Sequence, residues 1–447
     1  MFKKDLGIVI CNFNKIDYLR DCLKSISCAN FDDLTYDIIV VDNASSDGSE
    51  QMIIEEFPDV ILIPTGSNLG GSGGFARGMQ YVLDIKYKYL SVLDNDTKVD
   101  INAFIELKNY LDKNDEVGIV GATILKMDEP EIIQEIGAQL DFEEYGFILN
   151  YNDRKYDEKI PKIVQCDYVP ACCFMTRYEI VEKVGVFDTS YFIYWDDIEW
   201  CTRVKNLGKQ IHAISTSKVW HKGGAKLVTS TFPTYYFYRN LIRFFVKNLN
   251  HSDIPKFAEV IADKISKMFY FSTIKNEYNN IISLLSGITD AYSEKTGAQW
   301  NSIFDRNRQE NRFFTFCENK NIALIEYKDI LYFRGVVRNL ISSNAKLTIF
   351  VEDISTSEVL NYFPNLIIKE IGTLDKKKFD FVVKAEKHIE YMLDNYDDEI
   401  FYLDPHGNFV MDKDSYNDVI NFQGFRKIFM PVYVKLFEQQ FKIMKDK

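Results

Sequence analysis

Short apolar runs alternate with segments of helical periodicity over about the first 130 residues. Four apolar runs predict buried strands, and apolar residues from Ile16 to Ile26 recur at the spacing of one helix face. Strands that alternate with helices are typical of an α/β fold with a parallel sheet. The predicted strands are 6–10, 36–41, 60–63 and 89–93.

Polar residues directly follow these apolar runs. Asn12 ends the first, Asp42 and Asn43 end the second, and Asp94-Asn95-Asp96 ends the fourth. The carboxyl ends of parallel strands share one edge, where open α/β sheets bind nucleotides. Asp94 and Asp96 are one residue apart, so in an extended segment their carboxylates point the same way and can share a divalent cation. The sequence therefore predicts a binding site at this edge.

A glycine-rich segment precedes the fourth strand: Asn68-Leu69-Gly70-Gly71-Ser72-Gly73-Gly74-Phe75-Ala76-Arg77. Its glycines permit a close backbone approach, and it leads into a predicted helix whose amides can face an anion. It matches neither the dinucleotide-binding G-x-G-x-x-G nor the P-loop pattern. A flexible surface turn is the alternative, but the position before the Asp94 strand favours contact with a phosphate-bearing ligand.

A second acidic cluster, Trp195-Asp196-Asp197-Ile198-Glu199, starts a predicted helix. Asp197 can accept a proton from an attacking hydroxyl, while Asp196 and Glu199 can position this base or bind sugar hydroxyls. The indole face of Trp195 can pack on a sugar ring. The alternative is a helix N-terminus enriched in acids, which is common.

His221 follows an apolar pair, Val219-Trp220. Its imidazole can complete a metal shell with Asp94 and Asp96. A lone histidine is more often a hydrogen-bonded structural residue, and the sequence leaves this alternative open.

Composition places these motifs in a large globular chain. With 447 residues and 46% hydrophobic content, we expect two or three domains, and the net charge of -13 argues against nucleic-acid binding. The N-terminus lacks the pattern of a signal peptide, and no apolar run approaches the roughly 20 residues that span a bilayer, so we expect a cytosolic location. The eight cysteines have no regular spacing, which predicts reduced thiols without structural zinc.

One segment departs from this acidic character. Residues 200–252 contain no acid but hold several lysines and arginines, together with aromatic residues between Tyr235 and Phe245. This basic aromatic segment suits a diphosphate or an anionic membrane surface. A helix with a charged outer face and an aromatic core face is the alternative.

Past about residue 315, new apolar runs predict a small α/β domain with a helical tail. It carries no phosphate-loop fingerprint, and Asp404-Pro405-His406-Gly407 predicts a turn. We expect partner or membrane contacts from this domain. Its predicted strands are 322–327, 347–351, 366–368, 379–383 and 400–403.

The order of the motifs resembles that of family 2 inverting glycosyltransferases of the GT-A fold, over about the first half of the chain. The segment from Asn68 to Gly78 and the triplet Trp195-Asp196-Asp197 are most similar to bacterial galactofuranosyltransferases, and next to rhamnosyltransferases. The motifs that carry the resemblance are Asn12-Phe13-Asn14, Asp42-Asn43-Ala44-Ser45-Ser46-Asp47-Gly48-Ser49, Asn68-Leu69-Gly70-Gly71, Asp94-Asn95-Asp96, Trp195-Asp196-Asp197-Ile198-Glu199 and His221-Lys222-Gly223-Gly224.

The resemblance implies a catalytic domain and a role for each site residue. It implies a GT-A catalytic domain over 1–230, followed by a helical extension packed on it over 231–314, while the small α/β domain over 315–447 lies outside the similarity. Mn2+ or Mg2+ would be held by Asp94, Asp96 and His221, with Asp197 as the catalytic base. Donor contacts would come from Asn12, Asp42, Asn43, Asn68, Gly70, Gly71, Arg77, Asp94 and Asn95.

The implied reaction transfers galactofuranose from UDP-galactofuranose to a hydroxyl of a growing cell-surface glycan on a lipid carrier. The implied location is the cytoplasmic side of the cell membrane, with peripheral membrane contact and a homo-oligomer as further expectations. dTDP-rhamnose is the alternative donor. A non-catalytic scaffold of a glycan-assembly complex is the alternative of another class, which the acids at every candidate position disfavour.

Overall fold

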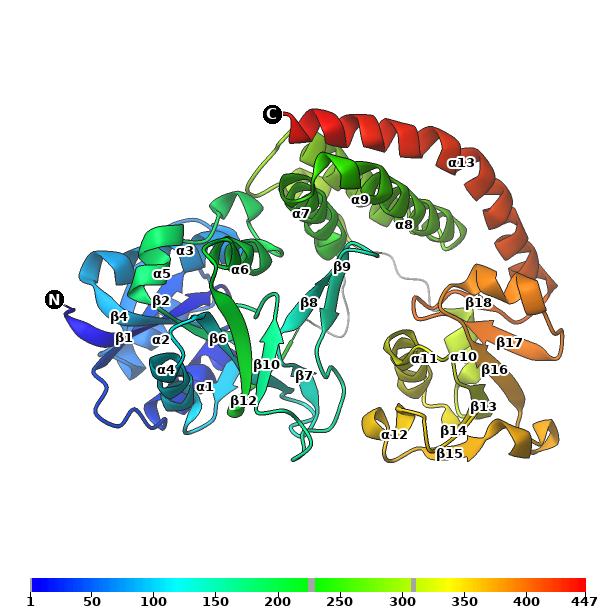
Figure 1. The fold of residues 1–447 in the computed structure, drawn as a ribbon, viewed down its shortest axis with the longest axis horizontal. Helices are drawn as coiled ribbons and strands as arrows, with labels where there is room; N and C mark the ends of the chain where they lie inside the picture. Colours follow the sequence, from blue (N-terminus) through cyan, green and yellow to red (C-terminus); the bar gives the residue numbers. More distant parts are fainter. Residues whose placement is uncertain (1, 224–229, 307–310) are drawn as a thin grey trace. The chain divides into compact units, whose positions relative to one another are not determined.

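The computed structural model describes residues 2–223, 230–306 and 311–447. The chain divides into two compact units (Figure 1): the first comprises 1–251, 282–305 and 444–447, and the second comprises 252–281 and 306–443. The three-part division at 230/231 and 314/315 stays a prediction, because this grouping follows different boundaries. Gly224, the last residue of the His221 motif, lies outside the described residues.

A ten-stranded mixed sheet forms the centre of the first unit. Its strands are β1 (Lys4–Asn12), β2 (Tyr36–Asp42), β3 (Ile61–Pro64), β4 (Tyr87–Asp94), β5 (Thr97–Val99), β6 (Val117–Lys126), β7 (Ile133–Glu135), β10 (Ile163–Cys166), β11 (Cys173–Arg177) and β12 (Gln210–His221). The main order is β10-β12-β6-β11-β4-β1-β2-β3, and β8 (Ala138–Asp141) and β9 (Gly146–Leu149) form a separate hairpin. The first four strands run parallel as predicted, and β11 enters antiparallel between β4 and β6.

The parallel register brings the predicted polar residues to one edge. Asn12 stands opposite Asp42, and Cys11 stands opposite Asp94. The prediction that these strand ends meet is confirmed.

Helices cover this sheet, as Figure 1 shows. They are α1 (Ile16–Ser27), α2 (Ser49–Glu56), α3 (Gly70–Ile85), α4 (Ala103–Lys113), α5 (Tyr178–Val184), the 3-10 helix η1 (Thr189–Tyr191) and α6 (Asp196–Asn206). Helix α7 (Phe232–Asn248) belongs to the same unit but does not lie on the sheet. Helix α1 buries Leu19, Leu23 and Ile26 in the same core as strand residues Ile8 and Ile10. This burial is the predicted role of its apolar face.

The glycine-rich segment is the start of a helix rather than a loop, since α3 begins at Gly70. A Cβ on Gly74 would lie 2.2 Å from Cys11 Sγ, and one on Gly78 would lie 2.2 Å from Val9 Cγ1. These glycines therefore let α3 approach β1 more closely than any side chain permits. Gly71 differs, because a Cβ there would meet nothing within 4 Å.

The basic aromatic segment supplies α7. Tyr235, Tyr236, Arg239, Phe244 and Phe245 on this helix are all buried. The alternative of a helix with an aromatic core face is therefore confirmed for these side chains, and they are not exposed to a membrane.

The second unit holds a six-stranded sheet in the order β15-β14-β13-β16-β17-β18, in which only β18 is antiparallel. Its strands are β13 (Asn321–Ile325), β14 (Lys346–Val351), β15 (Ile367–Glu370), β16 (Phe381–Ala385), β17 (Ile400–Leu403) and β18 (Phe409–Val410). Its helices are α8 (Ile254–Ile274), α10 (Arg312–Cys317), α11 (Ile330–Ser342), α12 (Val359–Tyr362) and α13 (Lys413–Lys445), while α9 (Tyr278–Tyr292) belongs to both units. The predicted α/β domain with a helical tail is confirmed.

The turn predicted after β17 is also present. Asp404 Oδ1 accepts hydrogen bonds from the backbone N–H of His406 and of Asn408, both at 2.9 Å. All eight cysteines are free thiols. Within the described ranges, no helix has both the length and the apolar character that a membrane crossing requires.

We expect Gly78→Ala to destabilise the first unit by about 1–3 kcal/mol, because the added Cβ overlaps Val9 on the sheet. Gly71→Ala is the matched control, in the same helix but with open space, and should change stability by less than about 1 kcal/mol. Equal urea midpoints for the two variants would contradict this account. Tryptophan fluorescence reports the first unit alone, because that unit holds Trp195, Trp200, Trp220 and Trp300.

Candidate active site

A strained turn leads into the second acidic cluster. Phe192, Tyr194 and Trp195 have φ angles of 67°, 63° and 68°. Such conformations cost about 1–3 kcal/mol each for residues other than glycine, and they persist only where the surroundings hold them. Within a few residues the chain therefore reverses direction and starts α6 at Asp196.

Two side chains of helix α7 hold this turn by donating hydrogen bonds to the carbonyl groups of the turn. Asn240 Nδ2 donates to the carbonyls of Tyr191, Ile193 and Tyr194 at 3.0, 2.8 and 3.0 Å. The Arg239 guanidinium donates to the Tyr191 carbonyl at 2.7 Å. Both side chains are fully buried, so this clamp fixes the direction in which the acidic cluster leaves the turn.

The metal candidates meet at the end of β12, where antiparallel pairing with β5 places His221 opposite Thr97. His221 Nε2 lies 3.0 Å from Asp96 Oδ1 and 3.7 Å from Asp94 Oδ2. Burial lowers the pKa of His221, but its hydrogen bond to Asp96 and the charge of Asp94 outweigh burial and raise this pKa. Burial raises the pKa of Asp94 to about 6. A bound cation would stabilise the charged form of Asp94. At Asp96, burial is already outweighed by the hydrogen bond and charge of His221, which lower the pKa.

The sequence argument missed a neighbour of this cluster, Cys172. Its Sγ, one carboxylate oxygen of Asp94 and one ring nitrogen of His221 all lie within 4.8 Å of one another. Antiparallel pairing sets Cys173 opposite Leu93, and Asp94 N–H donates to the Cys172 carbonyl at 3.1 Å. Carboxylate, imidazole and thiol donors together fit a first-row divalent cation.

The amide and carboxylate side chains beside this cluster already form hydrogen bonds with one another. Asn12 Nδ2 donates to Asp42 Oδ1 at 2.8 Å, and Asn95 Nδ2 donates to Asn12 Oδ1 at 2.7 Å. Ser45 N–H and Oγ also donate to Asp42, at 2.8 and 2.7 Å. Asn12 and Asp42 are fully buried, so the network fixes the shape of the sheet edge.

The predicted residues at the start of α3 form a second set of contacts. Asn68 Oδ1 accepts from Gly70 N–H, and Asn43 Nδ2 donates to the Gly70 carbonyl, both at 2.8 Å. Asn43 Oδ1 is buried and has no hydrogen-bond partner among the described residues. Arg77 lies apart on the exposed side of α3, and in the described part of the chain its guanidinium forms no ion pair.

A buried hydrogen bond joins α3 to α6. Ser72 Oγ donates to Asp196 Oδ2 at 2.8 Å, and Ser72 N–H donates to the Phe192 carbonyl at 3.1 Å. The charge of Asp196 contributes to the raised pKa of Asp94, so the two acidic clusters lie close enough to interact. The structure therefore brings both predicted clusters into one site.

Asp197 has the environment of a base. Its Oδ2 accepts from Ala171 N–H at 3.3 Å and its Oδ1 from Ile198 N–H at 2.8 Å. Burial, followed by the charge of Asp196, raises the pKa of Asp197 to about 8. A carboxylate that holds a proton this tightly is a stronger base than an ordinary aspartate.

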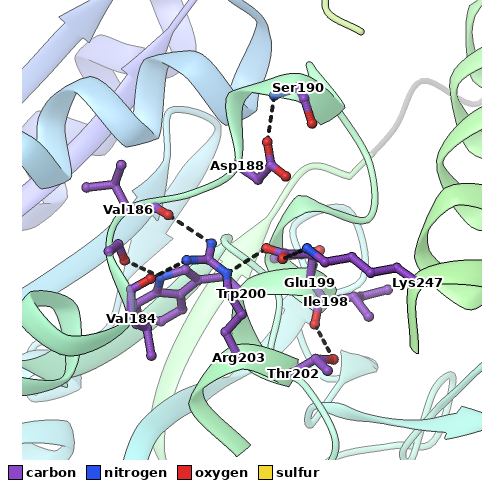
Figure 2. Close-up of polar contacts among 12 residues, drawn as sticks. Val184, Val186, Asp188, Ser190, Ile198, Glu199, Trp200, Thr202, Arg203 and Lys247 are labelled. Atoms are coloured by element: carbon purple, nitrogen blue, oxygen red, sulfur yellow. Dashed lines mark hydrogen bonds and ion pairs between the residues drawn. The ribbon is translucent and has the colours of Figure 1, made fainter. Parts of the chain in front are cut away.

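Two residues expected to bind the acceptor are engaged elsewhere. Figure 2 shows Glu199 between Arg203 and Lys247, with ion pairs of 2.9 and 3.0 Å. Trp195 is only 2% exposed, because its ring packs in an aromatic cluster. The expectation that these side chains face a sugar needs correction: Glu199 ties α6 to α7, and Trp195 fills the core beneath the turn. The aromatic cluster around Trp195 consists of Phe147, Phe237, Phe244 and Phe245.

Glu135, at the end of β7, is a second residue that the sequence argument missed. It is 6% exposed, and its Oε2 has no hydrogen-bond partner among the described residues. Burial raises its pKa to about 7, and its charge acts on both His221 and Asp197. A perturbed buried carboxylate in this position is a functional candidate. Sequence spacing gave no signal for it, because the pairing of β6 with β7 brings it here.

These features define an α/β domain with an acidic, cation-compatible site at the carboxyl edge of its sheet and interacting buried acids at the start of α6. Residues 7–185 match the family model described as Glycosyl transferase family 2. Residues 7–185 are therefore similar to family 2 glycosyltransferases, as the motifs predicted, and the predicted α/β fold is confirmed.

Relatives with known names are similar over about half of this chain. The low-salt glycan biosynthesis hexosyltransferase Agl10 of Haloferax volcanii is 25% identical over 45% of this chain and 62% of its own length. The dTDP-rhamnosyl transferase RfbF of Shigella flexneri is 26% identical over 56% and 86%. The galactofuranosyltransferase GlfT2 of Mycolicibacterium smegmatis is 21% identical over 49% and 37%. Among solved structures, GalNAc-T7 with UDP, GalNAc and Mn2+ aligns at 13% identity over 58% of this chain and 51% of that chain, with a TM-score of 0.45.

We expect Asp96→Asn to raise the Kd for Mn2+ about tenfold or more, because it removes a charge from the cluster around His221. Titration of free Mn2+ by electron paramagnetic resonance measures this affinity without any turnover. Asp100→Asn is the matched control. It also removes a carboxylate near the end of β5, but Asp100 pairs with Lys218 at 4.0 Å rather than with His221. Equal Mn2+ affinity in Asp96→Asn and the unchanged chain would exclude Asp96 from the metal site.

Proposed function

We propose that the chain is an inverting, metal-assisted hexosyltransferase that uses a nucleotide sugar as donor. One observation carries the proposal: the buried Asp197 adjoins Asp196, and the charge of Asp196 acts on Asp94 in the cluster of Asp94, Asp96 and His221. A base and a cation-compatible site side by side are what sugar transfer from a diphosphate requires.

In the proposed reaction, Asp197 takes the proton of an acceptor hydroxyl while that oxygen attacks the anomeric carbon. The new C–O bond forms as the bond to the donor's diphosphate breaks on the opposite face, so the configuration inverts. Asp94, Asp96, His221 and Cys172 would hold a divalent cation, which would supply positive charge to neutralise the departing diphosphate. Burial of the base excludes competing water.

UDP-galactofuranose is the donor we propose. The motif resemblance from Asn68 to Gly78 and at Trp195-Asp196-Asp197 supports it, together with the relative named a galactofuranosyltransferase. dTDP-rhamnose is the second candidate, because the rhamnosyl transferase RfbF matches over more of its own length.

The proposed acceptor is a growing cell-surface glycan on a lipid carrier at the cytoplasmic face of the membrane. A relative named for glycan biosynthesis supports the acceptor class. A scaffold without activity is disfavoured, because a scaffold needs no buried acids with raised pKa values such as Asp94 and Asp197.

We expect selective, chelator-sensitive transfer from UDP-galactofuranose in a panel that also holds UDP-galactopyranose, UDP-glucose and dTDP-rhamnose. Product formation on lipid-linked sugar acceptors with Mn2+ is the measurement. Asp197→Asn should lower kcat at least about 100-fold and leave UDP binding intact, because it removes only the base.

Glu179→Gln is the control for this experiment, since Glu179 is an exposed acid on α5. Transfer from dTDP-rhamnose would overturn the donor and keep the base. Full activity of Asp197→Asn would overturn the mechanism.

Asp196→Asn is expected to move the acid limb of kcat/KM to lower pH. The base works only when deprotonated, so turnover should rise with pH as the carboxyl of Asp197 loses its proton. Loss of the neighbouring charge favours the ionised form of Asp197 and lowers its pKa, while the amide still accepts from Ser72. Profiles of kcat/KM from about pH 5 to about pH 10 check this, and an unmoved limb would contradict it.

A further inference from the structure

Helix α13 presents two different apolar faces. Its inner face packs on α8, where Phe422, Phe425 and Phe441 meet Tyr270, Phe269 and Phe257 at ring-centroid distances of 5.3, 6.1 and 4.8 Å. Arg426 and Asp263 add an ion pair of 2.6 Å between the two helices. The inner face therefore accounts for the attachment of α13 to its own unit.

The outer face carries apolar side chains that this packing does not use. Ile428 is 77% exposed, Val432 is 54% exposed and Leu436 is 48% exposed. They recur every four residues, so they form one row along the helix. Ile420 and Ile443 extend the row at 44% and 45% exposure.

Lysines line one flank of this row. Lys427, Lys435 and Lys442 are exposed, and each stands one residue before a member of the row. One residue is a rotation of about 100° around a helix, so the three lysines lie on the same side. Between Val419 and Phe437 the chain contains no acidic residue, although its net charge is -13.

We propose that the outer face of α13, from Ile420 to Ile443, docks on an anionic lipid surface. The apolar row enters the boundary between headgroups and acyl chains, and the lysines reach the phosphates beside it. The charge favours an anionic lipid surface as the partner, because Lys427 and Lys435 lie in an acid-free stretch of an acidic protein and complement a negative surface. Lys442, nearer the C-terminus, is paired with Glu438 at 2.5 Å. Docking of this kind needs no helix that crosses the membrane.

Vesicle binding by the full chain tests the proposal without donor, acceptor or metal, so its outcome is independent of the proposed reaction. We expect binding to phosphatidylcholine vesicles that contain about 30% phosphatidylglycerol, weak binding to phosphatidylcholine alone, and a decrease with salt. The combined variant Ile428→Ser, Val432→Ser and Leu436→Ser should weaken binding more than about tenfold.

The charge variant Lys427→Gln with Lys435→Gln should also weaken binding about tenfold, and it keeps the apolar row intact. Matched controls in the same unit are Ile341→Ser with Leu360→Ser, both 44% exposed, and Lys377→Gln with Lys378→Gln. Circular dichroism checks that every variant is folded.

Equal binding to both vesicle types, or unchanged binding by both α13 variants, would overturn the proposal. Sedimentation of the chain without lipid tests whether this face binds a second copy instead. If the chain is dimeric and the serine variant is monomeric while vesicle binding is unchanged, the face binds a second copy and the lipid proposal is wrong.

Discussion

The turn before α6 is the constraint on which the site depends. It places three residues other than glycine in positive φ conformations. Without the surrounding structure, these residues would relax to conformations of lower energy. Asn240 and Arg239 satisfy its carbonyl groups from a buried position on α7. Each hydrogen bond contributes about 1 kcal/mol, so several are needed to offset strain of this size. The position of Asp197 is thus set by a helix more than 30 residues further along the chain.

Buried negative charge is the second organising feature. Burial is the first cause of the raised pKa at Asp94, Glu135 and Asp197, which reach about 6, 7 and 8. Their mutual repulsion adds to it, through Asp196 for both aspartates and through Glu135 for Asp197. In the proposed reaction, a bound cation would relieve this repulsion around Asp94, and transfer of the acceptor's proton to Asp197 would relieve it around Asp197. The raised pKa values follow from the burial of several acidic side chains close to one another.

The local sequence pattern was sufficient to predict which residues lie at the edge of the sheet. It was insufficient to predict the residues that antiparallel strands bring to the same site. Strand ends at Asn12, Asp42 and Asp94 follow from apolar runs, because parallel strands of an α/β fold end at one edge. Cys172 and Glu135 come from antiparallel pairings with β4 and β6, whose register no short motif specifies.

Burial explains the remaining errors of the sequence argument. Trp195 looked like a sugar platform because its neighbours are acids, but aromatic residues of α7 cover it. The glycines of α3 looked like a loop, whereas Gly74 and Gly78 allow a helix to touch the sheet. In both cases the deciding contact comes from an element distant in the sequence, which composition alone does not reveal.

Two segments with similar composition thus have different roles. Both α7 and α13 combine aromatic residues with lysine or arginine and contain no acid along most of their length. In α7 the aromatic residues and Arg239 are buried, so the charge serves backbone carbonyls within the protein. In α13, Phe422 and Phe425 pack against α8, and aliphatic residues beside lysines face outward. Which face is covered, rather than which residues are present, separates a structural clamp from a surface able to meet lipid.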